Sequence, residues 1–180
     1  MKKLTGWKLT VVRVLVLLLV VGLTVFLFIN RDRVKELEAL GYPGVFLVSL
    51  LANATLILPV PGVLFTSAMG AVFNPYLVAL AAGTGATLGE LTGYMAGFSG
   101  QGVIENRKWY DKVTSWMTKY GGITVLVLAF IPNPVFDIAG MVAGALRMPM
   151  WKYLIFSWIG KVGKMLLFAL GGAELFNQFL

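Results

Sequence analysis

The sequence predicts an all-α integral membrane protein, built as an inverted repeat of a re-entrant helical hairpin plus a transmembrane helix, with an extra N-terminal transmembrane helix. Three observations predict this fold class. Of the 180 residues, 58% are hydrophobic and only 13% are charged, which is too apolar for a soluble domain of this length. Apolar runs long enough to cross a bilayer alternate with runs that are too short to do so. The short runs and the prolines that interrupt them occur twice.

The composition also limits the chemistry. Cysteine and histidine are both absent, which excludes disulfides, thiol nucleophiles, histidine-based triads and the usual zinc sites. We therefore expect no enzyme activity, no catalytic residue, no cofactor and no metal. The net charge is +7, but the basic residues cluster at the ends of apolar segments, so they indicate membrane orientation and not nucleic-acid binding.

The first element is an apolar run over residues 9–29, which is interrupted only by Arg13. Its length matches the hydrocarbon core of a bilayer, so it predicts a spanning helix. A cleaved signal peptide is the alternative, but no small-residue cleavage site follows the run. Residues 1–39 are therefore expected to form an uncleaved anchor and a short loop.

A hairpin is predicted next. The apolar segment 45–58 is too short to span, and a second apolar piece follows over residues 63–73. Helix-breaking residues mark the turn and the end of this pair: Pro59, Pro61, Gly62 and Pro75. The pair is interpreted as a hairpin that enters the membrane and leaves on the same side. One long proline-kinked spanning helix remains the alternative.

A full-length helix is predicted over residues 76–98. Its glycines recur every four residues and share one face: Gly85, Gly89, Gly93 and Gly97. Such a stripe allows a second helix to pack closely in lipid.

Residues 101–120 have the pattern of an amphipathic helix lying on the membrane surface. The apolar face holds Trp109, Val113, Trp116, Met117 and Tyr120. The opposite face holds Lys108, Lys112 and Lys119.

The pattern then repeats, with short apolar runs over 122–131 and 135–146 and a long helix over 150–173. LPVPGVLFTSAMGAVFNP in the first copy aligns with IPNPVFDIAGMVAGALRMP in the second. The alignment pairs Pro59, Pro61, Gly70 and Pro75 with Pro132, Pro134, Gly144 and Pro149. The repeats cover about 42–98 and 121–176 of a domain over residues 40–180, and interrupted apolar segments in both halves are typical of transporter-like folds.

Each unit contains one full span, so the second unit starts from the opposite side of the membrane and the repeat is inverted. Basic residues precede the first helix and fill the linker, whereas the loop over residues 31–43 is balanced in charge. The positive-inside rule then predicts a multi-pass protein of the plasma or inner membrane with a cytoplasmic N-terminus.

The return arm of each hairpin begins within the membrane, where its free N–H groups would attract an anion such as a lipid phosphate. Glu90 follows Pro75 by fifteen residues and Lys164 follows Pro149 by fifteen, so the repeat makes them equivalent. Intramembrane charges are costly, and we expect these two to pair or to form part of a polar path.

Other polar residues are candidates for the same path. Asp137 lies in the first turn of the second return arm, where it would complement the helix N-terminus or bind a proton or a headgroup amine. Asn133 precedes Pro134, and helix capping is preferred for it over ligand contact. Lys161 shares a face with Lys164 and is expected to contact phosphate, and Asn53 is a weaker candidate.

The motif IPNPVFDIAG, with the MPMWKY and IGK that follow it, resembles the corresponding stretch of the vacuole membrane proteins. The wider pattern, over residues 40–173, resembles the VTT domain shared by the DedA and SNARE-associated Golgi protein families. The matching positions are Pro132, Asn133, Pro134, Phe136, Asp137, Ala139 and Gly140. The resemblance implies two opposed re-entrant hairpins and a role in moving phospholipid or lipid-phosphate carriers between leaflets.

The chain departs from the DedA pattern at places where that family has acidic residues before and after the first Pro-x-Pro and arginines around the second hairpin. The residues near those places here are Asn53, Val63, Ala129 and Phe136. The departures weigh against a proton-coupled carrier of the DedA kind.

The leading functional hypothesis is an ATP-independent lipid scramblase or flippase, with a headgroup path past Asn133, Asp137, Glu90 and Lys164. Its partners would be membrane phospholipids, bound through an anionic headgroup or a lipid phosphate. A proton- or ion-coupled transporter of small solutes is the second hypothesis, with protons as partners. The third is an assembly or membrane-organising protein without transport, which rests on the glycine stripe and the surface helix. A homo-oligomer is a further candidate partner.

Overall fold

The computed structural model describes residues 38–54, 62–100, 107–133 and 135–178. The predicted anchor helix over residues 9–29 and the break at Pro59 and Pro61 lie outside the described residues, as does Pro134. The regular elements described are helices: α3 (Glu38–Ala54), α4 (Gly62–Val72), α5 (Pro75–Gly89), α6 (Leu91–Phe98), α7 (Arg107–Tyr120), α8 (Gly122–Phe130), α9 (Phe136–Ala145) and α10 (Met150–Gln178).

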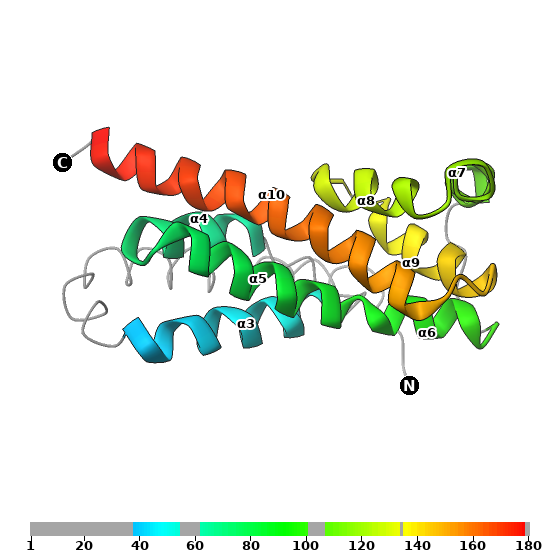
Figure 1. The fold of residues 1–180 in the computed structure, drawn as a ribbon, viewed down its shortest axis with the longest axis horizontal. Coiled ribbons are helices and arrows are strands. Elements are labelled where there is room, and N and C mark those ends of the chain that lie inside the picture. The colour runs from blue at the N-terminus through cyan, green and yellow to red at the C-terminus, as the bar shows by residue number, and fades with distance from the viewer. Residues whose placement is uncertain (1–37, 55–61, 101–106, 134, 179–180) are drawn as a thin grey trace, which may run out of the picture.

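Figure 1 shows how these helices run. Helix α3 runs from one end of the molecule toward its middle, α4 runs back toward the same end, and α5 with α6 then crosses to the far end. From that far end α8 runs to the middle, α9 runs back, and α10 crosses the length of the molecule (Figure 1). Helix α7 lies at the far end, where it packs on α8 and α9 (Figure 1). We call α3 to α6 the first set of helices and α8 to α10 the second set.

The two sets of helices exchange partners. Helix α3 packs on α5 and α8 packs on α10, so the first arm of each set contacts the long helix of its own set. Helix α4 packs on α10 and α9 packs on α6, so the second arm of each set contacts the other set. The long helices α5 and α10 also pack on each other.

Close packing at the exchanged contacts depends on glycine. A side chain at Gly70 would collide with the backbone of α10 at Ala169, and one at Gly144 would collide with the backbone of α6 at Tyr94 and Phe98. The absence of a β-carbon is what lets these backbones approach. The glycines that the repeat alignment pairs thus occupy matching contacts.

The predicted glycine stripe is confirmed as a packing face. A β-carbon at Gly85 or Gly89 would strike a carbonyl oxygen of α3, and one at Gly97 would strike the Met141 carbonyl oxygen of α9. At Gly93 it would meet the Asp137 carbonyl oxygen at 3.7 Å, which is ordinary contact. One stripe therefore serves two neighbours, α3 along α5 and α9 along α6.

The single helix predicted over residues 76–98 is divided in the structure. Asn74 caps its start, because its side chain accepts hydrogen bonds from the N–H groups of Tyr76 and Leu77, with Pro75 in the first turn. The division falls at Glu90, whose backbone stays in the right-handed helical region. Its N–H still donates to the Ala86 carbonyl and its own carbonyl accepts from Tyr94 N–H, so the chain direction is kept.

One helix of the described part of the chain is long and apolar enough to cross a membrane, judged by length and composition. It is α10 over Met150–Leu175, with a mean hydropathy of 1.5. Large apolar side chains also face outward over much of the molecule, including Leu51, Ile123 and Leu167, each of which is about 60% exposed. Such a surface suits lipid better than water.

The apolar face of α7 was predicted to lie on the membrane surface, but part of it packs on protein. Val113 and Met117 are buried against α8 and α9, whereas Trp109 and Tyr120 remain exposed. Only the outer part of the face is free for lipid, because the inner part covers protein.

Candidate functional site

A buried lysine lies at the centre of the molecule. Lys161, midway along α10, is only 2% exposed. Its Nζ donates to Glu90 Oε1 at 2.7 Å and to Asn53 Oδ1 at 2.9 Å. It also lies 4.7 Å from the centre of the Phe136 ring. We call Lys161, Glu90 and Asn53 the central cluster.

The helices that carry Asn53, Glu90 and Phe136 place these side chains next to Lys161. Asn53 lies in the last turn of α3, and its amide donates back to the Ser49 carbonyl at 2.8 Å, which leaves its oxygen free for Lys161. Glu90 lies at the α5–α6 junction and is 5% exposed. Phe136 is the first residue of α9. Burying a charge is costly unless it is paired and hydrogen-bonded, and here Lys161 has both kinds of partner.

The turn before α9 is held by Asn133. Its side-chain oxygen accepts from Val135 N–H at 2.9 Å, and its amide donates to the carbonyls of Leu128 at 2.9 Å and Ile131 at 2.7 Å. These bonds tie the end of α8 to the turn before α9. The predicted helix cap at Asn133 is wrong in position, because α9 begins at Phe136 and its N-cap residue is Val135, which has no side-chain capping bond. Of the motif residues that follow, Ala139 and Gly140 pack in the core, where Gly140 lies beside Tyr153.

Two further charges lie beside the central cluster but are not part of it. Asp137, in the first turn of α9, is exposed, and Lys164 on α10 is half-buried. Neither side chain forms a hydrogen bond or an ion pair with another residue in the described part of the chain. Lys164 lies three residues from Lys161 on α10, and Asp137 directly follows Phe136, whose ring contacts the Lys161 ammonium group. We call Asp137 and Lys164 the open pair.

The predicted pairing of Glu90 with Lys164 is wrong in its partner, because Glu90 bonds to Lys161. Equivalence in a repeat does not place two residues in contact, since only residues near the symmetry axis meet their own equivalents. The predicted phosphate contact of Lys161 is also corrected. Its ammonium group is buried and held by Glu90 and Asn53, so it is not accessible to a headgroup in this conformation.

Helix α10 carries a line of polar side chains that was not predicted from the sequence. Tyr153 and Ser157 precede Lys161 at four-residue steps, and both are fully buried. The Tyr153 hydroxyl, the Ser157 hydroxyl and that of Ser49 have no hydrogen-bond partner among the described residues. The four-residue spacing of polar residues in an otherwise apolar helix was the available signal. Among the described residues, no three acidic, histidine or cysteine side chains converge.

Known proteins are similar to this chain over the same region. Residues 60–174 match the family model of the VTT domain. Inner membrane protein YqaA of Escherichia coli is 31% identical over 128 residues, which cover 69% of this chain and 85% of that protein. No solved structure matches the chain.

Vacuole membrane proteins are similar over shorter stretches. Vacuole membrane protein KMS2 of Arabidopsis thaliana is 32% identical over 91 residues, or 48% of this chain. The Vacuole membrane protein 1 homolog of Dictyostelium discoideum is 39% identical over 51 residues, or 28% of this chain. The aligned stretches span 21% and 13% of those two proteins.

Proposed function

The chain belongs to the VTT domain family of membrane proteins, and from that premise we propose that it moves phospholipid between the two leaflets of its membrane without ATP. The observation that carries the proposal is the open pair. Asp137 and Lys164 are opposite charges that are accessible and have no hydrogen bond or ion pair with the rest of the described chain. Charged groups at membrane depth are costly, and such groups commonly mark a substrate path.

A phospholipid headgroup has the complementary chemistry. Its phosphate would interact with Lys164, and the amine of a zwitterionic headgroup would interact with Asp137. Charge-assisted hydrogen bonds of this kind are stronger than neutral ones, so they offset part of the cost of bringing a headgroup into the hydrocarbon region. An anionic headgroup would use the lysine alone.

The central cluster has a different part in this proposal. Lys161, Glu90 and Asn53 join α10, the α5–α6 junction and the end of α3 at one point. Because Glu90 forms an ion pair with Lys161, a passing phosphate meets one lysine without an ion pair and not two. The cluster would thus hold the helices around the path, while the open pair contacts the lipid.

We infer further that the chain is an inverted repeat of re-entrant hairpin plus transmembrane helix. The exchange of partners between the two sets of helices supports this, as do the matching contacts of Gly70 and Gly144. Trp158 Nε1 donates to Thr84 Oγ1 at 2.9 Å, and these residues are 74 positions apart, which is the period of the repeat. Contact between two equivalent residues is what a two-fold axis at that point would produce.

The same proposal includes location and orientation. The chain would be a non-enzymatic, multi-pass protein of the plasma or inner membrane with a cytoplasmic N-terminus, and the basic helix α7 supports the cytoplasmic side for the linker. A bacterial relative carries the name inner membrane protein.

Reconstituted vesicles test the function. Purified full-length protein is placed in vesicles with a trace of fluorescent phosphatidylcholine, and dithionite is added outside. We expect nearly all the fluorescence to be reduced, against about half in protein-free vesicles. The proposal would be overturned if the fluorescent lipid stayed as protected from dithionite as it is in protein-free vesicles. Lipid or solute movement that requires an imposed pH gradient would instead support proton-coupled transport.

Single cysteines test the topology, because the chain has none of its own. Thr118→Cys on α7 and Lys152→Cys at the start of α10 lie before and after the α8–α9 hairpin, and both positions are exposed. If the hairpin is re-entrant, a membrane-impermeant maleimide labels both from the same side. Labelling from opposite sides would mean that α8 and α9 together span the membrane.

A further inference from the structure

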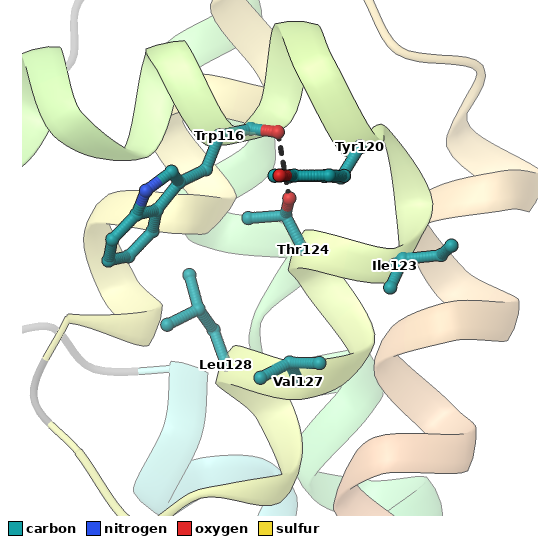
Figure 2. Close-up of a pocket in the computed structure, with 6 residues that line it drawn as sticks. All are labelled: Trp116, Tyr120, Ile123, Thr124, Val127 and Leu128. Atoms are coloured by element: carbon teal, nitrogen blue, oxygen red, sulfur yellow. Dashed lines mark hydrogen bonds between the residues drawn. The ribbon is translucent and has the colours of Figure 1, made fainter.

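An apolar groove lies between α7 and α8, and no residue of the central cluster or the open pair lines it. Figure 2 shows its lining, which comes from both helices: Trp116, Tyr120, Ile123, Thr124, Val127 and Leu128. Its volume is about 250 Å³. We call it the α7–α8 groove.

The groove is apolar although one lining residue carries a hydroxyl. Thr124 donates that hydroxyl to the Trp116 carbonyl oxygen at 3.0 Å, and the bond also ties α8 to α7 (Figure 2). The mouth is apolar too, since Ile123 is 59% and Val127 44% exposed. An open apolar groove on a membrane protein suits a hydrocarbon chain better than a polar ligand.

Two exposed lysines lie beside the groove, each over the ring of an aromatic residue that lines it, and not on the opposite face of α7 as predicted. Lys112 lies equally close to Trp109, which is outside the groove. Lys112 Nζ is 5.0 Å from the centre of the Trp116 ring, and Lys119 Nζ is 5.1 Å from the centre of the Tyr120 ring. Tryptophan and tyrosine prefer the headgroup level of a membrane, and neighbouring lysines attract anionic lipid. Positive charge at the rim and an apolar interior together match one amphiphile of negative charge.

We propose that the α7–α8 groove binds an anionic phospholipid, with one acyl chain beside Val127 and the phosphate between Lys112 and Lys119. The groove is smaller than the roughly 300–1,000 Å³ of most small-molecule sites, so it fits part of one acyl chain and not a complete ligand. The lipid would be retained and not transported, because neither residue of the open pair lines the groove. It would hold α7 at the membrane surface.

Native mass spectrometry of the full-length protein, released from mixed phosphatidylglycerol and phosphatidylcholine micelles, tests the site. We expect wild type to retain phosphatidylglycerol in preference, and the double variant Lys112→Gln/Lys119→Gln to lose that preference by about tenfold. The matched control is Lys152→Gln, because Lys152 also lies over an aromatic ring, at 5.5 Å from Trp151, but outside the groove. The control should retain lipid as wild type does.

A second measurement addresses the acyl chain. In a variant that keeps Trp116 and replaces the other four tryptophans by phenylalanine, brominated phosphatidylglycerol should quench Trp116 more than brominated phosphatidylcholine. Val127→Trp, which fills the groove, should reduce lipid retention in the mass spectra.

The proposal would be overturned if wild type retained both lipids equally and the double lysine variant retained them in the same way. So would a dimer that Val127→Trp converts to monomer without changing lipid retention, because the groove would then seat a second copy of the chain. The readout is bound lipid and not movement between leaflets. Failure of the proposed transport function therefore leaves this test intact.

Discussion

Lys161 and Lys164 lie on the same helix, three residues apart, and their surroundings differ completely. Lys161 is buried and bonded to Glu90 and Asn53, whereas Lys164 is half-buried and forms no ion pair or hydrogen bond with the described residues. The acids differ in the same way, since Glu90 is 5% exposed and Asp137 is exposed. Charge within the domain is therefore not expected to mark a substrate path by itself. We expect a charge with a protein partner to be structural and a charge without one to be available for binding.

The largest expected effect is on the stability of the central cluster. Lys161→Met leaves the Glu90 carboxylate buried without a counter-charge, which is expected to lower the free energy of unfolding by about 3–5 kcal/mol. The measurement is unfolding of the detergent-solubilised protein by titration with a denaturing detergent. Glu90→Leu/Lys161→Met, which removes both charges, should recover most of the loss.

Lys164→Met is the matched control for that experiment, because it changes the same residue type one turn along the same helix. It should alter the free energy of unfolding by less than about 1 kcal/mol, since no pair is broken. If the two single variants unfolded alike, the distinction between the central cluster and the open pair would be lost.

Lipid movement is expected to depend on the open pair, whose variants leave stability nearly unchanged. Asp137→Asn and Lys164→Gln each remove one charge-assisted contact to a headgroup, worth about 1.5–3 kcal/mol, so each should slow lipid movement by roughly tenfold or more. The rate of dithionite reduction in reconstituted vesicles measures it. Stability should stay close to that of wild type.

The controls are exposed charges elsewhere on α10. Glu174→Gln and Lys152→Gln lie on the surface of that helix and should leave the rate unchanged. Lys164→Arg keeps the charge and should retain most of the activity. Wild-type rates in Asp137→Asn and Lys164→Gln would show that the open pair does not contact the lipid.

Glycine packing gives a smaller effect and tests the exchange of partners between the two sets of helices. Gly144→Ala places a methyl group against the backbone of α6 at Tyr94 and should cost about 1–3 kcal/mol of unfolding free energy. Gly171→Ala is the control, because nothing lies near its β-carbon position and alanine favours a helix. Equal stability of the two variants would mean that α6 and α9 are not in tight contact in the membrane.

The sequence predicted the membrane class and the glycine stripe because both depend on local pattern. Residues four apart share a helix face whatever the rest of the chain does, so Gly85, Gly89 and Gly97 were recognisable as a packing surface. The family was recognisable from the motif IPNPVFDIAG for the same reason. The division of the helix at Glu90 was not signalled, since glutamate is an ordinary helix residue.

The ion pair could not be predicted, because it depends on which faces of the long helices meet. The repeat showed that Glu90 and Lys164 are equivalent, but only the rotation of α10 about its axis decides that Lys161 reaches Glu90. The role of Asn53 depends on the position of α3 relative to both. Both contacts of Lys161 depend on packing between segments that lie 71 and 108 residues apart in the chain, which periodicity within one segment does not report.

The smallest expected effect compares two stacked tyrosines, whose rings lie 5.1 Å apart in the core formed by α6 to α10. Tyr94 donates its hydroxyl to the Met148 carbonyl at 2.5 Å, whereas the buried Tyr153 hydroxyl has no partner among the described residues. Tyr94→Phe leaves that carbonyl without its bond and should lower the free energy of unfolding by about 1 kcal/mol. Tyr153→Phe removes a buried, unpaired polar group and should be neutral or stabilising, because the cost of its desolvation disappears. If Tyr153→Phe instead destabilised the protein as much as Tyr94→Phe, the Tyr153 hydroxyl would have a partner in the membrane, such as an ordered water next to Ser157, and the polar face of α10 would be hydrated from Tyr153 to Lys161.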